Sequence, residues 1–122
     1  MNATPLHPIV YAELHTPKTA EARGFYAGLF SWEMKLHGEL DYTEIQPGGG
    51  PEAGLMGLTP HDERPAWITY FGVPDLEAAV ARAVGLGAVL RAPKTEVPGH
   101  GWFAWLDDPT GARFALWQKA AA

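Results

Sequence analysis

The chain has 122 residues, of which 47% are hydrophobic and 19% are charged, and its formal net charge is −5 at pH 7. These values fit one soluble globular domain, and the acidic balance without a basic run argues against a nucleic-acid partner. Zero cysteines exclude disulfides and thiolate chemistry. No apolar run of about 18 residues suits a membrane span, and Met1 to Pro8 lacks a secretory signal pattern. We therefore expect a cytoplasmic protein.

The first half of the chain predicts a strand, a helix and three further strands. Ile9 to Leu14 alternates like a strand. Thr19 to Phe30 places apolar residues at the i, i+3, i+4, i+7 spacing of one helix face, and Pro17 or Thr19 suits its first turn. Turn signals then separate three extended pieces, which are Trp32 to Leu36, Leu40 to Gln46 and Ala53 to Leu58.

The second half repeats this plan at an offset of 57, the separation of Tyr11 and Ile68. Trp67 to Val73 predicts a strand, and the next helix begins after Pro74 and ends at Gly85 or Gly87. Three more strands are predicted at Ala88 to Ala92, Gly101 to Leu106 and Ala112 to Gln118, with a hairpin turn at residues 108–111. The surface that two such modules share is the natural place for a site.

The pattern predicts an α+β fold made of two tandem βαβββ modules in a single domain, residues 1–122. Module one covers about 9–58, residues 59–65 form a polar linker, and module two covers about 67–118. We expect one curved eight-stranded mixed sheet with both helices on its outer face. Its inner face would form a trough.

Three motifs carry a resemblance to a known superfamily. They are Ala20 to Trp32 with its aromatic pair and Gly-Leu turn, Val73 to Ala79 at a helix start, and Leu106 to Gly111 with Asp-Pro-Thr-Gly. Over Ile9 to Gln118 the chain resembles the vicinal oxygen chelate superfamily, which includes glyoxalase I, extradiol dioxygenases, fosfomycin-resistance enzymes and bleomycin resistance proteins. Residues 11–14 and 54–58 are similar to glyoxalase-like proteins often labelled hydroxylases. The resemblance implies a small-molecule ligand and a homodimer.

The resemblance also implies where metal ligands would stand. Those positions fall on Tyr11, Ile68 and Ala115, and near Leu58. Ile and Ala have no lone pair for a divalent ion, and a neutral phenol is a poor ligand. We therefore expect no cofactor and no metal. A divalent metal held by a displaced set remains an alternative, and that set would be Glu13, His15, Glu44 and His100.

The inward face of the predicted sheet is rich in aromatic residues. Tyr11, Tyr70 and Trp117 share inward parity, so a flat ligand could stack on them. Glu13 has two interpretations: it binds a cationic or hydroxyl group of the ligand or acts as a base, or it forms an ion pair with Arg113. The predicted ligand-binding residues are Tyr11, Glu13, Glu44, Met56, Tyr70, Trp102, Arg113 and Trp117.

These residues favour a metal-free small-molecule-binding protein of the sequestration or resistance type, with an aromatic-lined trough and an apolar or aromatic ligand that carries polar groups. The alternative is an enzyme of glyoxalase, dioxygenase or hydroxylase type, with Glu13 as the catalytic base or a displaced metal site. A third hypothesis is an interaction subunit whose trough is closed by its own side chains. We expect no membrane partner.

Overall fold

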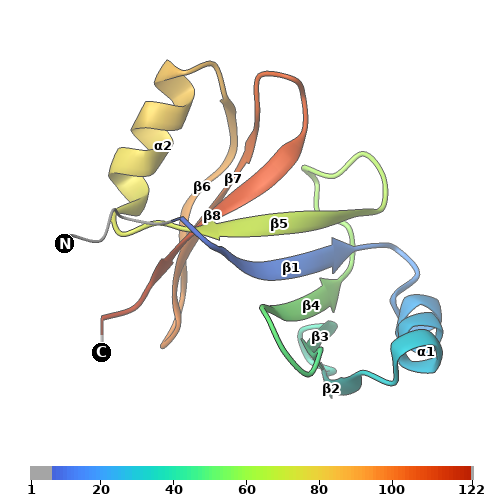
Figure 1. Cartoon of the computed structure of the whole chain (residues 1–122). Helices are drawn as coiled ribbons and strands as arrows, with labels where there is room; N and C mark the ends of the chain where they lie inside the picture. The colour runs from blue at the N-terminus through green and yellow to red at the C-terminus, as the bar shows by residue number, and fades with distance from the viewer. Residues whose placement is uncertain (1–6, 122) are drawn as a thin grey trace. The chain divides into compact units, whose positions relative to one another are not determined.

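The computed structural model describes residues 7–121 and divides into two compact units (Figure 1). One unit is Tyr11–Ile68, and the other contains residues 7–10 and 69–121. Most of the stretch Met1 to Pro8, for which no secretory signal is predicted, lies outside the described residues, as does Ala122.

The Tyr11–Ile68 unit contains one helix and a four-stranded set of the order β2-β3-β4-β1. β1 pairs with β4 in parallel, whereas β3 is antiparallel to both β4 and β2. Its elements are β1 (Ile9–His15), α1 (Thr19–Phe30), β2 (Glu33–His37), β3 (Tyr42–Gln46) and β4 (Glu52–Met56). All five lie within two residues of their predicted boundaries.

The core of this unit lies on one face of its strands. Leu14, Ile45, Ala53 and Leu55 are buried there, and Tyr26 of α1 packs against them. The alternation of each strand sends the neighbours of these residues to the opposite face, which is polar.

The apolar face predicted for α1 packs only in part. Phe25, Leu29 and Phe30 are 60%, 57% and 51% exposed, and α1 has no buried residue. Tyr26 stacks on Trp32 with ring centroids 5.7 Å apart, so the aromatic residues of α1 pack partly against one another. The helix spacing was a correct guide to helix formation but overestimated how much of that face is buried.

The second unit has the strand order β5-β8-β7-β6, with β5 parallel to β8 and the other neighbours antiparallel. α2 is capped at its start by Asp75, whose carboxylate accepts a hydrogen bond from the Ala78 amide at 3.1 Å. Gly87, at φ +109°, follows the helix as its spacing predicts. The elements are β5 (Ala66–Gly72), α2 (Leu76–Gly85), β6 (Val89–Val97), β7 (Gly101–Asp107) and β8 (Arg113–Lys119).

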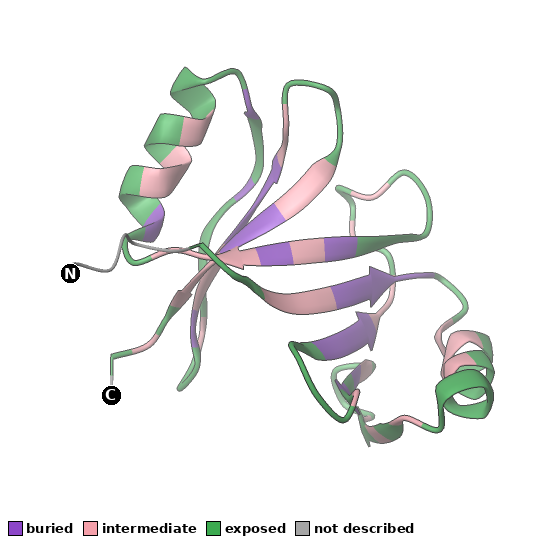
Figure 2. Cartoon of the chain, in the orientation of Figure 1, coloured by how far each residue is buried: buried purple, intermediate pink, exposed green. Residues whose placement is uncertain are grey.

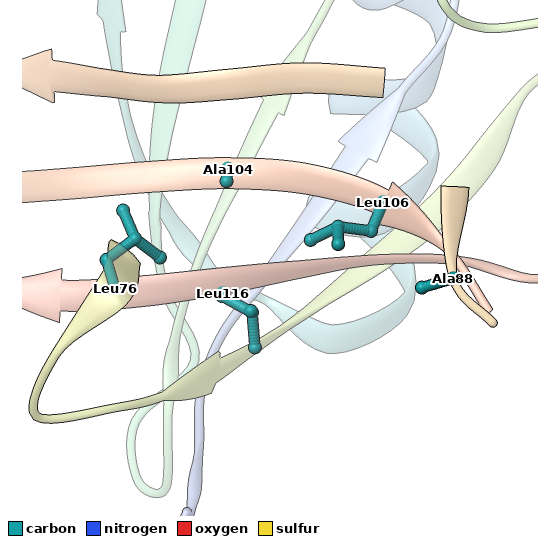
Figure 3. Close-up of a cluster of buried hydrophobic side chains, with 5 residues drawn as sticks. All are labelled: Leu76, Ala88, Ala104, Leu106 and Leu116. Atoms are coloured by element: carbon teal, nitrogen blue, oxygen red, sulfur yellow. The ribbon is translucent and has the colours of Figure 1, made fainter. Parts of the chain in front are cut away.

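α2 covers one face of β6, β7 and β8 and closes a second core. This core consists of Leu76, Ala88, Ala104, Leu106 and Leu116 (Figure 3). Figure 2 shows buried segments on the strands, whereas the outer side of α2 is exposed.

β6 is longer than the sequence predicts. It was expected to end at Ala92, but it continues to Val97. β6 stands at the end of the strand order, and its register with β7 shifts between Ala92 and Thr95. A proline has no N–H to donate to a neighbouring strand, but an edge strand needs hydrogen bonds on one side only. At the irregularity in its pairing with β7, β6 can therefore continue through Pro93.

The eight strands form a mixed sheet, and with two helices they give an α+β fold. Both halves follow the element order βαβββ. The predicted fold class is therefore confirmed. Neither α1 nor α2 is long and apolar enough to cross a membrane, and the described residues contain no other α-helix.

Candidate functional site

The polar face of β1 carries three functional side chains in alternate positions, Tyr11, Glu13 and His15. They lie opposite the core residue Leu14. Glu13 and His15 are only 5% and 1% exposed. Buried polar groups of this kind cost several kcal/mol unless they are hydrogen-bonded. Their partners therefore define what this face can do.

His15 bridges two carboxylates. Its Nε2 lies 2.7 Å from Glu13 Oε1, and its Nδ1 lies 2.8 Å from Asp62 Oδ2. Because both ring nitrogens face acceptors, the imidazolium form donates to each. Burial opposes this charge, but the hydrogen bonds to Glu13 and Asp62 outweigh burial and raise the pKa of His15 above 6.5.

Asp62 is held by a turn in the predicted linker. The backbone N–H and the hydroxyl of Thr59 donate to Asp62 Oδ2 at 2.8 and 2.9 Å, and the Asp62 amide donates to the Thr59 carbonyl at 3.0 Å. Burial opposes ionisation of Asp62, but the Thr59 amide and His15 hold the pKa of this carboxyl below its usual range. Asp62 is thus a fixed anion behind His15.

Two phenols complete the arrangement. Tyr42 of β3 donates its hydroxyl proton to Glu13 Oε2 at 2.7 Å, and the hydroxyls of Tyr42 and Tyr11 are hydrogen-bonded to each other. Burial is the main cause that raises the pKa of both phenols, and the charge of Glu13 adds to it. Both phenols are therefore neutral at physiological pH. We refer to Tyr11, Tyr42, Glu13, His15 and Asp62 as the buried polar chain.

Gly54 of β4 makes room for the two phenols. It is the register partner of both Glu13 and Glu44, so it lies between β1 and β3. A Cβ atom at Gly54 would stand 2.0 Å from Tyr42 Oη and 2.3 Å from Tyr11 Oη. Glycine is therefore required here for close approach of side chains rather than for a special backbone angle.

Two further predicted residues lie on the same face. Glu44 is on β3 two positions after Tyr42, and its carboxylate accepts a hydrogen bond from His37 Nε2 at 2.8 Å. Met56 is the register partner of both His15 and Tyr42. The structure thus brings Tyr11, Glu13, Glu44 and Met56 to one face of one unit. His37 is the last residue of β2.

The second unit has an aromatic face of its own. Buried Tyr70 accepts a hydrogen bond from Trp105 Nε1 at 2.9 Å. The Trp105 ring lies 5.1 Å from that of Phe103, and Trp117 is the register partner of Phe103. Trp102, by contrast, packs against the core under α2. The ligand-binding roles predicted for Tyr70, Trp117 and Trp102 stay predictions.

Arg113 lies at one end of this unit beside an acidic partner. Its guanidinium forms an ion pair with Asp107, which also binds Arg91 at 2.7 Å. Slight burial opposes ionisation of Asp107, but Arg113 and Arg91 hold the pKa of this carboxyl below its usual range. Arg113 thus has an ion-pair partner within its own unit, and its role as a ligand anchor stays a prediction.

The residues at the positions implied for metal ligands do not fit a divalent ion. Tyr11 is hydrogen-bonded to Tyr42, while Ile68 and Ala115 are buried and carry only carbon. Between residues 7 and 121, no three or more His, Asp or Glu side chains form a group that could hold a metal. In the displaced set, both nitrogens of His15 are already directed at carboxylates.

Sequence reasoning missed Tyr42 and Asp62, and it treated His15 only as a possible metal ligand. Tyr42 shares the parity of Glu44 on a correctly predicted strand, so its position on the polar face could have been inferred. The Thr59-to-Asp62 spacing is typical of a side-chain-stabilised turn. That signal indicates a turn, but its contact with His15 depends on tertiary structure.

Comparison with known proteins agrees with this fold. A family model described as "Glyoxalase-like domain" matches residues 11–117. The Mycobacterium tuberculosis protein named "Putative glyoxylase CFP32" is 31% identical over 120 residues, which cover 92% of this chain and 44% of that protein. Anthracycline biosynthesis protein DnrV of Streptomyces peucetius is 28% identical over 124 residues, covering 88% and 45%. The chain spans less than half the length of these relatives.

Solved structures show the same fold at low identity. Methylmalonyl-CoA epimerase from Mycobacterium tuberculosis superposes with a TM-score of 0.66 at 16% identity, covering 99% of this chain and 94% of that one. Hypothetical protein BH1468 from Bacillus halodurans gives 0.69 at 10% identity, covering 95% and 96%. The family model matches most of the chain, and this protein therefore belongs to the glyoxalase-like domain family.

Proposed function

We propose that this protein binds a small organic molecule without a metal, at the polar face of the Tyr11–Ile68 unit. The observation that carries the proposal is the buried polar chain, whose members are linked by hydrogen bonds from Tyr11 to Asp62. Tyr11 stands at one of the positions that the resemblance implies for a metal ligand. A fully hydrogen-bonded set of this kind is rigid, and rigid polar groups give a ligand site its specificity.

The two ends of the buried polar chain, Asp62 at one and Tyr11 at the other, have different roles. Asp62 and His15 are fixed by the Thr59 turn and hold Glu13 in place. Tyr11 and Tyr42 are partly exposed, so the phenols rather than Glu13 contact the ligand. Both oxygens of Glu13 already accept hydrogen bonds, and its role is to orient Tyr42.

The names of relatives support an organic ligand. Two Streptomyces relatives are named for anthracycline biosynthesis, which favours an apolar or aromatic natural product with polar groups. The proposal includes a cytoplasmic homodimer and a role in sequestration or resistance. Within the same unit, Glu44 and Met56 would give further ligand contacts beside the buried polar chain. The roles predicted for Tyr70, Arg113 and Trp117 concern the other unit and stay predictions, and Trp102 packs against the core under α2.

The test is a fluorescence titration of the five tryptophans with a library of aromatic natural products, with and without EDTA. We expect saturable quenching that EDTA leaves unchanged and that Tyr11→Phe weakens. Tyr26→Phe is the matched control. It removes a phenol hydroxyl that accepts a hydrogen bond from Nε1 of exposed Trp67 at 3.0 Å and that is not part of the buried polar chain. Equal binding by the Tyr11→Phe variant, or quenching that EDTA abolishes, would contradict the proposal.

A second candidate function is acid–base catalysis with Glu13 as the base. The observation that favours it is the aligned order of hydrogen bonds from Tyr11 through Tyr42 to Glu13. A proton taken from a bound molecule at Tyr11 could pass along this order, with Glu13 gaining a proton and the ligand becoming an anion. Glu13→Gln should then abolish turnover and preserve binding. Unchanged turnover in that variant would remove Glu13 from the chemistry.

A further inference from the structure

The sheet has two end strands, and they differ in how well they resist pairing with a further strand. Among the described residues, β2 and β6 each have a strand neighbour on one side only. β6 has features that protect such an edge, because Pro93 and Lys94 lie within it and its register with β7 is irregular. β2 contains no proline, and its five residues pair with β3 in an unbroken register. β2 is therefore the end strand that is better suited to accept another strand.

β2 carries two opposite charges on one face. Glu33 and Lys35 are exposed and two positions apart, so both point away from the core against which Met34 packs. Within residues 7–121, neither of the two side chains has an ion-pair partner. Glu44 is the register partner of Lys35, but its carboxylate is paired with His37. An acid and a base at this spacing are complementary to a second copy of the same strand.

Two copies of β2 can pair in antiparallel fashion about a two-fold axis that passes between their Met34 residues. Glu33 of each copy then lies directly opposite Lys35 of the other copy, which gives two ion pairs. Opposite charges in such cross-strand positions stabilise a sheet, and like charges destabilise it. The neighbouring registers that keep the faces aligned place Lys35 opposite Lys35 or Glu33 opposite Glu33. The charges of β2 therefore select one register.

The same register brings exposed apolar side chains together on the other face. Leu36 shares the parity of Met34 and is 50% exposed. It would lie opposite Trp32 of the second copy, whose ring centroid is 4.7 Å from that of Phe30. Phe30 is 51% exposed and belongs to α1, which contacts β2 (Figure 1). A second copy would thus cover apolar groups that the core of one copy leaves in solvent.

We infer that β2 is the surface through which a second copy of this chain binds, by antiparallel pairing of residues 32–36 about a two-fold axis. The inference rests on the homodimer of the proposed function and names its interface. Glu33 and Lys35 lie on the face of the strands that also carries Glu44. The pairing therefore continues the polar face of one Tyr11–Ile68 unit into that of the other copy.

The test measures association of the full chain by sedimentation velocity from about 5 µM to about 1 mM, because so small an interface is weak. Lys35→Glu and Glu33→Lys each place like charges opposite each other twice, and each should raise the dimer dissociation constant about tenfold or more. The double variant Glu33→Lys/Lys35→Glu restores both ion pairs with the signs exchanged, so its dissociation constant should return close to that of the wild type. An equal mixture of the two single variants should form a heterodimer for the same reason.

Matched controls separate this contact from general effects of charge and folding. Lys94→Glu makes the same change of net charge on the other end strand, and it should change the dissociation constant by no more than about twofold. Leu36→Ala should weaken the dimer. Leu40→Ala should not, because it truncates a 78% exposed leucine outside the paired residues. Circular dichroism checks that every variant is folded.

The outcomes separate the interface from the rest of the proposed function. A wild-type dimer that Lys35→Glu and Glu33→Lys leave intact would overturn the β2 interface and leave the homodimer standing. Equal weakening by Lys94→Glu, or no recovery in the double variant and in the mixture, would also overturn it. A wild type that stays monomeric up to about 1 mM would overturn both the interface and the homodimer. Ligand binding at the polar face is judged separately, by the fluorescence titration.

Discussion

Replacing Gly54 with alanine should break the buried polar chain where its two phenols meet. The new Cβ would lie 2.0 Å from Tyr42 Oη, 2.3 Å from Tyr11 Oη and 2.6 Å from Tyr42 Cζ. Ordinary contacts begin at 3.4 Å, so both phenols must retreat by more than 1 Å. Neither hydroxyl can then keep its present partner.

The expected cost follows from two effects. Inserting a methyl group into a packed site costs about 1–3 kcal/mol, and losing a hydrogen bond to a charged group costs about 1.5–3 kcal/mol. Partial relaxation of Tyr42 reduces the sum, so we expect Gly54→Ala to lower the free energy of unfolding by about 2–4 kcal/mol.

Urea denaturation followed by tryptophan fluorescence measures this change. Gly57→Ala is the matched control, because its Cβ would have its nearest neighbour, Asp41 Oδ2, at 3.9 Å. It should alter stability by no more than about 0.5 kcal/mol. A Gly54→Ala variant as stable as the Gly57→Ala variant would refute the close approach of the phenols over Gly54.

Three other predictions concern titration and capping. The folded protein holds a proton on His15 that the unfolded chain releases above pH 6.5. The free energy of unfolding should therefore fall as the pH rises from 6.5 through the raised folded-state pKa, by up to about 1.4 kcal/mol per pH unit. Urea denaturation at a series of pH values should show this slope, and His15→Gln should flatten it. Alkaline difference absorbance should show that Tyr11 and Tyr42 stay protonated at pH 10.0, where an ordinary phenol ionises, until the protein unfolds. If all four tyrosines titrated together in the folded protein, the burial of these two phenols would be contradicted. Asp75→Ala should cost about 1 kcal/mol of stability through loss of the α2 cap, measured by urea denaturation, and an unchanged midpoint would argue against that cap.

The fold could be predicted well because the helices and strands of each module show clear short-range periodicity and turn residues. The alternation of Ile9 to Leu14 and the apolar spacing of Thr19 to Phe30 are properties of adjacent residues, and both elements form. The end of β6 was predicted too early, at Ala92, and only the sheet order shows that this strand lies at an edge, where Pro93 is tolerated. The exposure of Phe25 likewise depends on packing, which periodicity does not encode.

The candidate site was predictable only in part. Parity placed Tyr11 and Glu13 on one face, and the structure puts both in the buried polar chain. No local sequence pattern indicates that His15 has a partner 47 positions away. In the structure, His15 Nδ1 lies 2.8 Å from Asp62 Oδ2. Contacts between a strand and a distant turn arise from tertiary structure, and one sequence does not specify them.

Metal content decides most directly between metal-free binding and a displaced metal site. Tag-free protein, purified without chelator, would be analysed for elements before and after dialysis against Ni²⁺, Zn²⁺, Mn²⁺ and Fe²⁺. We predict less than about a tenth of an equivalent of each metal even after loading, because Tyr11, Ile68 and Ala115 offer no ligand set. Close to one equivalent of a single metal would contradict metal-free binding and would make Glu13, His15, Glu44 and His100 the first residues to mutate.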